Sequence, residues 1–370
     1  MFTISGMKIL TVCSGIDFVN FTRRATIEAI HMINPEMDIL QYNSILNIFK
    51  RKERVTRIRF YNYHFWTVES LRKFRIFQIF EYSLRYIYWK NFFKRYQVIF
   101  FIDPNQYYLL PYLSRYHKLV YLLRDPSILQ DPDNFHRELP IIKRADIILG
   151  ISQNLCSYYF KKYYGYIPSG VHLWPNTVDL DLWNYKRWTR HVKPKERALV
   201  GFAGNINYVI DIGLLIYIAE RLPEIDFELA GKISLNMKEK EELDHLLKLP
   251  NVRHLGFITY DHFPAVVMNW DIGLVTAKPD HEYALYLNNN KQYQYMALGK
   301  PFVTYRLNAD YREFLDLVFI AENKIDYVEK IKLALEKAKE ISCPEKGLKI
   351  ARNHSSEIRA KQFLQIVSHE

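Results

Sequence analysis

The sequence has little cysteine and no long apolar segment. Three cysteines occur in 370 residues, an odd number without a C-x-x-C pair. This pattern argues against a disulfide framework and a cysteine zinc site, and it is typical of a reducing compartment. No apolar run approaches the ~20 residues that a membrane-spanning helix needs. The polar N-terminus, "MFTISGMKILTVCSG", does not have the pattern of a signal peptide. We therefore expect a cytoplasmic protein without a transmembrane anchor.

Aromatic side chains and positive charge are abundant and concentrate in one segment. The chain holds 28 Tyr, 23 Phe and 6 Trp, and its formal net charge is +11. Residues 50–96 contain 13 Lys or Arg against 3 Asp or Glu, and residues 60–96 contain 15 aromatics. Cations interleaved with aromatics at helical spacing are typical of a helix that lies in the interface of an anionic membrane. A core helix with charged edges is the main alternative.

The residues that we expect at the membrane are Trp66, Arg72, Lys73, Arg75 and Trp89. A nucleic-acid patch is a second alternative, but nothing else in the sequence resembles a known nucleic-acid module, so no nucleic-acid partner is expected.

Short apolar runs alternate with amphipathic stretches along most of the chain. The runs span 8–13, 97–103, 118–123, 146–152, 198–204, 226–231, 251–257, 271–277 and 301–305. The helical patterns span 134–144, 208–222, 237–248, 289–298 and 324–341. Strands buried on both faces appear as continuous apolar runs, and helices alternate with them in doubly wound sheets. The sequence therefore predicts an α/β fold with two doubly wound, Rossmann-like domains that face each other across a cleft.

A polar, basic stretch at 184–197 interrupts this alternation, and we interpret it as the linker between the domains. The predicted domains are 1–190 and 191–350. One last helix is expected at about 347–368, and the C-terminal segment 351–370 is expected to pack back on the first domain. Ligands of doubly wound sheets bind beyond the carboxyl ends of the strands, so the loops after the apolar runs are the places to search.

The stretch "GFAGNIN" at 201–207 follows the first strand of the second domain. Gly201 and Gly204 would let the backbone turn sharply before a helix. The N-terminus of that helix would offer free N–H groups and a positive dipole end, which suit an anion. The alternative is that the glycines serve turn packing only.

Lys291 stands at the start of the amphipathic helix expected at 289–298. Lysine is disfavoured at this end because a helix N-terminus is already partly positive, unless an anion binds there. Asn289 or Asn290 can cap the helix, and Gln294 lies on the same face as Lys291. This combination suits a diphosphate. A solvated lysine and a surface glutamine are the alternative.

The segment "KQYQYMALGKP" (291–301) resembles a helix of GT-B nucleotide-sugar-dependent glycosyltransferases, "K-x-Y-E-Y-x-A-x-G-K-P", which lies under the nucleotide. Gln294 stands where the retaining families have a glutamate, and Tyr286 stands where they have a second one. The pattern resembles instead the inverting glucuronosyltransferase family of xanthan assembly, in which this Lys and Gln contact the UDP diphosphate and sugar. The segments 174–183 and 351–367 also resemble this superfamily.

The resemblance implies GT-B architecture, a UDP-sugar donor that is UDP-glucuronate in the xanthan family, and no cofactor or metal. The donor-binding residues that it indicates are Gly204, Asn205, Ala277, Asn290, Lys291 and Gln294. The sequence "DLD" at 179–181 is a metal-binding pattern in another glycosyltransferase fold. Within "PNTVD" we interpret it as a structural turn, and no His or Cys cluster indicates a metal elsewhere.

The catalytic base is expected in the first domain. The strand ending "YLLRDPS" places Asp125 where the xanthan family has the catalytic Asp of "Y-R-x-S-D", with Arg124 in place of the Ser. A carboxylate there would take the proton of the acceptor hydroxyl. Asp17 is the competing base, and an Asp-Pro turn is the structural alternative for Asp125. Gly15, Arg23 and Arg124 are expected on the acceptor side.

Together these patterns predict an inverting glycosyltransferase of exopolysaccharide or cell-surface glycan synthesis. It would move a sugar from a UDP-sugar to a polyprenyl-diphosphate-linked glycan at the cytoplasmic face of an anionic membrane. A GT-B nucleotide-sugar epimerase is one alternative, although such an enzyme acts on a soluble substrate and has no use for the basic aromatic segment. A non-catalytic, membrane-associated nucleotide-sugar-binding protein is the other.

Overall fold

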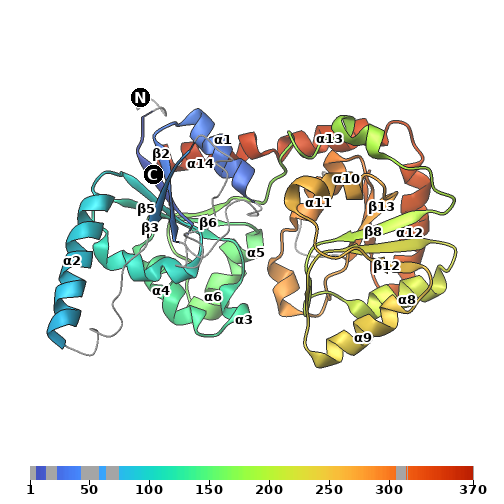
Figure 1. Cartoon of the computed structure of the whole chain (residues 1–370), viewed down its shortest axis with the longest axis horizontal. Coiled ribbons are helices and arrows are strands. Elements are labelled where there is room, and N and C mark those ends of the chain that lie inside the picture. Colours follow the sequence, from blue (N-terminus) through green and yellow to red (C-terminus); the bar gives the residue numbers. More distant parts are fainter. Residues whose placement is uncertain are drawn as a thin grey trace. The chain divides into compact units, whose positions relative to one another are not determined.

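The computed structural model of the chain describes residues 6–13, 23–42, 58–63, 75–305, 314 and 316–369 (Figure 1). The chain divides into two compact units. Unit 1 comprises 1–175 together with 360–370, and unit 2 comprises 176–359. Each unit contains a parallel sheet accompanied by helices, so the predicted α/β class with two doubly wound sheets is confirmed.

The sheet of unit 1 has the strand order β3-β2-β1-β4-β5-β6-β7, and neighbouring strands pair in parallel. The strands are β1 (Ile9–Val12), β2 (Met37–Tyr42), β3 (Arg59–Tyr63), β4 (Val98–Phe101), β5 (Lys118–Leu123), β6 (Ile147–Gly150) and β7 (Val171–Leu173). The chain order reverses between β1 and β4, the position at which doubly wound sheets bind ligands. Strands β1, β4 and β6 are buried along their whole length, which explains why they appear as continuous apolar runs.

The helices of unit 1 are α1 (Arg24–Ile33), α2 (Arg75–Phe93), the 3-10 helix η4 (Pro104–Tyr112), α3 (Ser127–Gln130), α4 (Asn134–Arg144), α5 (Gln153–Cys156) and α6 (Tyr158–Tyr164). Helix α2, coloured blue in Figure 1, carries the C-terminal part of the basic aromatic segment. No helix within the described ranges is both long and apolar enough to span a membrane.

The chain returns to unit 1 through its last helix. Phe363 of α14 (Ser356–His369) packs on Phe100, with ring centroids 4.9 Å apart, and Lys118 Nζ donates to the Val367 carbonyl at 2.9 Å. The single helix expected near 347–368 is in fact two, α13 (Cys343–Asn353) and α14. The break occurs because the backbone of Val178 bonds to His354 and Ser356, drawing this part of the chain out of helical pairing.

The main sheet of unit 2 has the order β12-β10-β8-β13-β14-β15, again parallel, and β9 and β11 form a small second sheet. The strands are β8 (Leu199–Ala203), β9 (Ile206–Asn207), β10 (Asp226–Ala230), β11 (Ile233–Ser234), β12 (Val252–His254), β13 (Ile272–Val275), β14 (Phe302–Tyr305) and β15 (Val318–Ala321). Here the chain order reverses between β8 and β13, so the loops after these two strands are the expected ligand loops.

The other helices of unit 2 are α7 (Tyr185–Trp188), η5 (Thr189–His191), α8 (Ile212–Arg221), α9 (Met237–Leu247), η6 (Tyr260–His262), α10 (Phe263–Val267), η7 (Glu282–Tyr286), α11 (Asn290–Ala297) and α12 (Lys324–Ala338). The division of the chain falls at 175/176 rather than at 190/191. The stretch 184–197, expected to be a linker, is fixed within unit 2: Lys186 pairs with Glu345 at 2.8 Å, and Lys195 pairs with Asp271 at 2.7 Å.

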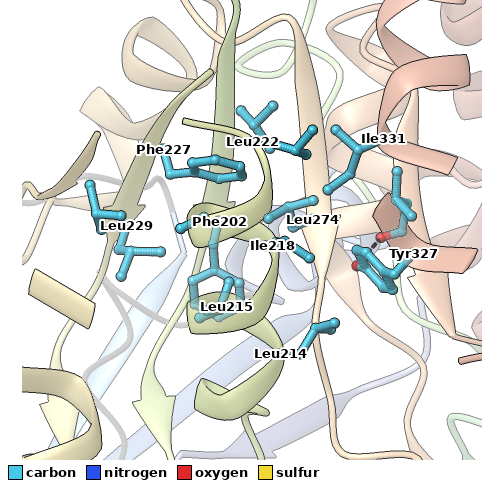
Figure 2. Packing of buried hydrophobic residues seen from close by; sticks show 14 of the residues in the cluster. Phe202, Leu214, Leu215, Ile218, Leu222, Phe227, Leu229, Leu274, Tyr327 and Ile331 are labelled. Carbon is cyan, nitrogen blue, oxygen red and sulfur yellow. Dashed lines mark hydrogen bonds between the residues drawn. The ribbon is translucent and has the colours of Figure 1, made fainter. Parts of the chain in front are cut away.

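The apolar core of unit 2 fills the space between the sheet and the helices α8 and α12 (Figure 2). Phe202 of β8 is fully buried there, next to Leu215 and Ile218 of α8. Tyr327 of α12 donates its hydroxyl to the Val303 carbonyl at 2.8 Å, so the buried polar atom is satisfied. Burying each such side chain stabilises the fold by about 1.5–3 kcal/mol. The aromatic face of Phe202 also forms part of the site described next.

Candidate functional site

The loop after β8 and the start of α11 come together around one ammonium group. Lys291 Nζ lies 4.1 Å from the centroid of the Phe202 ring. A Cβ atom built on Gly204 would lie 3.1 Å from the same nitrogen, so a side chain at 204 would crowd the lysine. Gly204 also has φ of +132°, which side-chain-bearing residues rarely adopt. The two stretches that the sequence singled out separately therefore form one site.

Within the described part of the chain, the ammonium of Lys291 has no counter-charge. Burial lowers the pKa of Lys291 to about 7, because burial removes water from around the charged form. Among the described residues no carboxylate forms an ion pair with this nitrogen, and its close neighbour is the ring of Phe202. A partly buried cation without an anionic partner, at the carboxyl end of a central strand, is suited to bind an anion.

A network of asparagines holds the start of α11. Asn288 Oδ1 accepts the backbone N–H of Asn176 at 3.0 Å, and Asn288 Nδ2 donates to the Tyr293 hydroxyl at 3.0 Å. The expectation that Asn289 or Asn290 caps the helix through its side chain is wrong. Asn289 occupies the N-cap position without a side-chain cap bond, and Asn290 is the first helical residue. Asn176 belongs to the "PNTVD" segment, so this segment positions the helix that carries Lys291.

The other expected donor-side residues also belong to unit 2. Gln294 is 9% exposed and lies one turn along α11 from Lys291. Asn205 is exposed beside Gly204, and the buried Ala277 follows β13, where it forms a bridge with Ile210. All six predicted donor-side residues thus lie in the loops after β8 and β13 or in α11. Their roles in binding stay predictions.

The "GFAGN" stretch differs from the expectation in two respects. Gly201 lies within β8, not in a turn, and it is required because a Cβ there would collide with the Trp270 indole. The helix α8 begins only at Ile212, and the carboxylate of Asp211 already accepts the N–H of Leu214 at 2.8 Å. The N-terminus of α8 is therefore capped by an acid, and Lys291 supplies the positive charge at this edge of the sheet.

Asp179 of the "DLD" pattern accepts the backbone N–H groups of Asp181 at 3.0 Å and Leu182 at 3.3 Å. It acts as the cap of a turn within unit 2. No group of three or more His, Cys, Asp or Glu side chains in the described ranges is arranged to hold a metal ion.

In unit 1, Asp125 lies in a small charged cluster after β5. Arg124 Nε is 3.4 Å from an Asp125 carboxylate oxygen, and Arg124 Nη2 is 3.2 Å from Asp103, which follows β4. The same residues line a cavity of about 60 Å³. Sequence reasoning named Asp125 and Arg124 but missed Asp103. The signal was available, because "FIDPN" places a polar residue directly after a buried strand, as "LLRDP" does.

A buried acid contacts Tyr121, one of the residues that line the cavity. Glu138 of α4 accepts hydroxyl hydrogen bonds from Tyr121 at 2.6 Å, Tyr159 at 2.8 Å and Tyr164 at 2.6 Å. Burial raises the pKa of Glu138 although the three hydroxyls act in the opposite direction. Sequence reasoning missed this cluster, since its members are far apart in the chain and belong to three separate elements.

Most of the remaining predicted residues of unit 1, or their side chains, lie outside the described part of the chain. Gly15 and the competing base Asp17 lie outside the described residues, as do Trp66, Arg72 and Lys73. Arg75 begins α2, and only its backbone is described.

Arg23 and Trp89 are core residues. Arg23 is 3% exposed, and its guanidinium lies 4.4 Å above the Trp174 ring, a cation–π contact that occupies the side chain. Trp89 is 5% exposed and packs against Phe92 and Phe93. The expectation that Trp89 contacts a membrane is therefore wrong, because its indole belongs to the core of unit 1.

No protein-family model matches the sequence, and no curated protein matches it either. Solved structures do match over almost the whole chain. Anabaena HepE in complex with UDP superimposes with a TM-score of 0.72 at 14% identity, covering 98% of this chain and 100% of that chain. Sucrose-phosphate synthase from Thermosynechococcus elongatus gives 0.72 at 12% identity, covering 98% of each chain.

The lipopolysaccharide outer core galactosyltransferase WaaB gives a TM-score of 0.66 at 12% identity, covering 98% of this chain and 99% of that chain. At such low identity these likenesses establish the fold, which is the two-sheet GT-B fold of these glycosyltransferases. They do not establish which reaction this chain catalyses, and that argument depends on its own residues.

Proposed function

We propose that the protein is a glycosyltransferase that takes its sugar from a UDP-sugar. The observation that carries the proposal is the uncompensated ammonium of Lys291, held against Gly204 and Phe202 at the reversal point of the unit 2 sheet. In this proposal the diphosphate of the donor supplies the missing negative charge. The GT-B fold supports it, because solved structures of this fold include UDP and UDP-glucose complexes of HepE.

In this proposal Lys291 does more than hold the donor. Cleavage of the sugar–phosphate bond leaves additional negative charge on the departing UDP, and a preorganised cation nearby stabilises that charge in the transition state. Gln294, one turn further along α11, would contact the sugar end of the diphosphate, as the resemblance implies. Because Lys291 supplies the positive charge, we expect transfer to continue when divalent metals are chelated.

The proposed base is Asp125. Inversion at the anomeric carbon requires an acceptor hydroxyl that attacks in line with the leaving diphosphate, and a carboxylate that takes its proton. Asp125 has the chemistry and the position after β5, on the wall of a cavity in unit 1. The replacement of two retaining-family glutamates by Gln294 and Tyr286 supports inversion.

We further propose that the acceptor is a polyprenyl-diphosphate-linked glycan and that the protein binds the inner face of the cell membrane. The surface that supports this is the exposed part of α2. Ile76 is 84% exposed and Ile87 is 58% exposed, and Tyr86 and Tyr88 are also exposed. The exposed cations Lys90, Lys94 and Arg95 lie along the same stretch of chain. Apolar side chains next to cations match an anionic lipid surface.

A two-stage assay tests the proposal. First, UDP and a panel of UDP-sugars, UDP-glucuronate included, are added in a thermal unfolding experiment. A ligand at 100 times its dissociation constant should stabilise the fold by about 2.7 kcal/mol. Second, the stabilising UDP-sugar is incubated with polyprenyl-diphosphate glycans, and transfer and UDP release are measured.

The outcomes separate the candidate functions. Transfer to the lipid-linked glycan supports the proposal. Conversion of the UDP-sugar into its epimer without an acceptor would indicate a GT-B epimerase. Stabilisation by UDP-sugars without turnover would indicate a binding protein. Absence of any stabilisation by uridine nucleotides would refute the donor assignment.

A further inference from the structure

The cavity of unit 1 is small and polar, and it lies at the carboxyl ends of β4 and β5. Its volume is about 60 Å³, room for roughly four to six waters at ~10–15 Å³ each. The side chains that matter on its wall are Asp103, Asn105, Arg124, Asp125, Ser127 and Asn134. A hexose does not fit inside as a whole. The space suits one edge of a sugar ring with its adjacent hydroxyl groups.

Hydrogen bonds, two of them buried, fix the segment that carries Asp103 and Asn105. The buried side chain of Gln106 accepts from the Ile102 N–H at 2.8 Å and donates to the Val12 carbonyl at 2.6 Å, which fixes η4 against β1. Asp103 Oδ1 accepts the Asn105 N–H at 2.9 Å and holds the first turn of η4. Ligand binding would therefore require little reordering of this wall.

The guanidinium groups near the cavity are already paired with carboxylates. Arg124 contacts the carboxylates of both Asp103 and Asp125. Arg137, which donates to the lining residues Asn105 and Asn134, lies 3.5 Å from an Asp131 carboxylate oxygen. Among the described residues that line the cavity, the two carboxylates of Asp103 and Asp125 outnumber the one guanidinium group, that of Arg124, by one. An incoming anion would find each of these guanidinium groups already paired and would meet like charge, which disfavours it.

The amides supply directed donors. Arg137 Nη1 donates to Asn105 Oδ1 at 3.2 Å and to Asn134 Oδ1 at 3.1 Å. Since arginine can only donate, both amide oxygens must face it, and both NH₂ groups point elsewhere. Asn134 Nδ2 donates to the Ser127 carbonyl at 3.0 Å. Within the described part of the chain, Asn105 Nδ2 has no hydrogen-bond partner.

We propose that this cavity binds the terminal sugar of the acceptor through neighbouring hydroxyl groups, and that it selects an uncharged sugar over an acidic one. Sugar hydroxyls donate to the carboxylates and accept from Asn105 Nδ2, so both hydrogen-bonding directions are used. A uronate or phosphorylated sugar is rejected by the surplus carboxylate. The assignment of this sugar as the acceptor rests on the proposed function, whereas the binding itself does not.

Saturation-transfer NMR on the full chain tests the proposal. The probes are the methyl glycosides of glucose, galactose and mannose, compared with those of glucuronate and galacturonate. We expect at least one neutral glycoside to bind at least tenfold more tightly than either acidic one. Asn105→Leu should weaken that binding at least fivefold, and Asn91→Leu, an exposed asparagine of α2, should leave it unchanged. Asp103→Asn should narrow the preference for neutral glycosides.

Three results would overturn the proposal: no binding of any neutral glycoside, equal binding of the acidic ones, or an Asn105→Leu variant that binds like the parent. Thermal unfolding of each variant shows whether it is folded. Lys291→Ala separates this proposal from the proposed function, since it should lose affinity for UDP and keep the glycoside. If the parent protein binds a neutral glycoside but no UDP, the sugar-site proposal stands and the proposed UDP-sugar transferase function is refuted.

Discussion

Each unit places a cation beyond the carboxyl ends of central strands of its sheet, but the two cations have opposite surroundings. Lys291 stands beside Gly204 and the Phe202 ring, and burial lowers its pKa to about 7. Arg124 contacts two carboxylates, Asp103 and Asp125. Among the described residues no carboxylate pairs with Lys291 in unit 2, whereas the lining of the unit 1 cavity has two carboxylates and one guanidinium group.

This difference indicates what each site can bind. A cation without a counter-charge gains most from a ligand that carries its own negative charge, such as a diphosphate. A cation saturated by carboxylates adds little for an anion, and the surrounding oxygens and amides favour hydroxyl groups. The fold is the same in both units, so the neighbours of the cation, rather than the sheet topology, determine the ligand class.

The largest expected effect concerns Asp125, a carboxylate of the unit 1 cavity. Asp125→Asn keeps the shape of the side chain and removes its basicity. Loss of a general base costs about 10²–10⁴ in rate. We therefore expect transfer to fall by that order while UDP-sugar affinity and thermal stability stay near those of the parent. Steady-state transfer and calorimetric UDP titration measure the two quantities.

The matched control is Asp17→Asn. If Asp125→Asn keeps most of the transfer activity and Asp17→Asn loses it, the base is Asp17. If neither exchange slows transfer, the inverting mechanism proposed here is wrong.

The second effect concerns the exposed cations in and just after α2. Each cation near an anionic leaflet contributes about 1 kcal/mol, so reversing Lys90, Lys94 and Arg95 to Glu should weaken binding to anionic vesicles at least 10²-fold. Sedimentation with vesicles that contain phosphatidylserine measures this. UDP affinity should not change.

Reversal of three exposed lysines of unit 2, Lys238, Lys240 and Lys248, is the control and should alter vesicle binding much less. Equal binding of the parent protein to neutral and anionic vesicles, or insensitivity to salt, would count against the membrane surface.

The third effect addresses the cation without a counter-charge. Lys291→Ala should weaken UDP affinity by about 1.5–3 kcal/mol, the range for a hydrogen bond to a charged group, or roughly 10- to 100-fold. Gln294→Ala should cost less. The same exchange should not destabilise the free protein, since burial disfavours the charged lysine. Lys300→Gln is the matched control, because burial also lowers the pKa of Lys300, to about 8, and this lysine follows the C-terminal end of α11.

Much of the fold follows from the sequence because buried parallel strands and amphipathic helices leave periodic patterns. The pattern at 134–144 coincides with α4, and the run at 118–123 coincides with β5. The strands β2, β3 and β7 were not predicted. They include polar residues such as Asp38, Arg59 and His172, so their sequences lack a continuous apolar run.

The candidate site was predictable only in part. Gly204 could be singled out as a glycine in a turn after a strand. Lys291 could be singled out as a lysine at a helix N-terminus, where lysine is disfavoured. Their proximity depends on the tertiary structure, so it could not be predicted from local sequence patterns. The burial of Trp89 could not be predicted either, since the spacing of a membrane helix and of a core helix is the same. The pairing of Arg124 with Asp103 joins loops after two different strands.

The most direct test of the account is the proton linkage of UDP binding. Burial lowers the pKa of Lys291 from 10.5 to about 7, so above pH 7 the free protein holds this lysine mostly neutral. A bound diphosphate favours the charged form and raises that pKa. Binding should then take up a proton, and this contribution to affinity should fall by up to tenfold for each pH unit above about 7. Below pH 7 the lysine is already charged, so no uptake is expected.

The measurement is calorimetric titration of UDP at pH 8 in two buffers with different ionisation enthalpies. We predict uptake of about one proton for each UDP bound by the parent protein, and none by Lys291→Ala, which should also bind more weakly. Equal affinity of the two proteins, with no proton taken up by either, would contradict the assignment of Lys291 as the partner of the diphosphate.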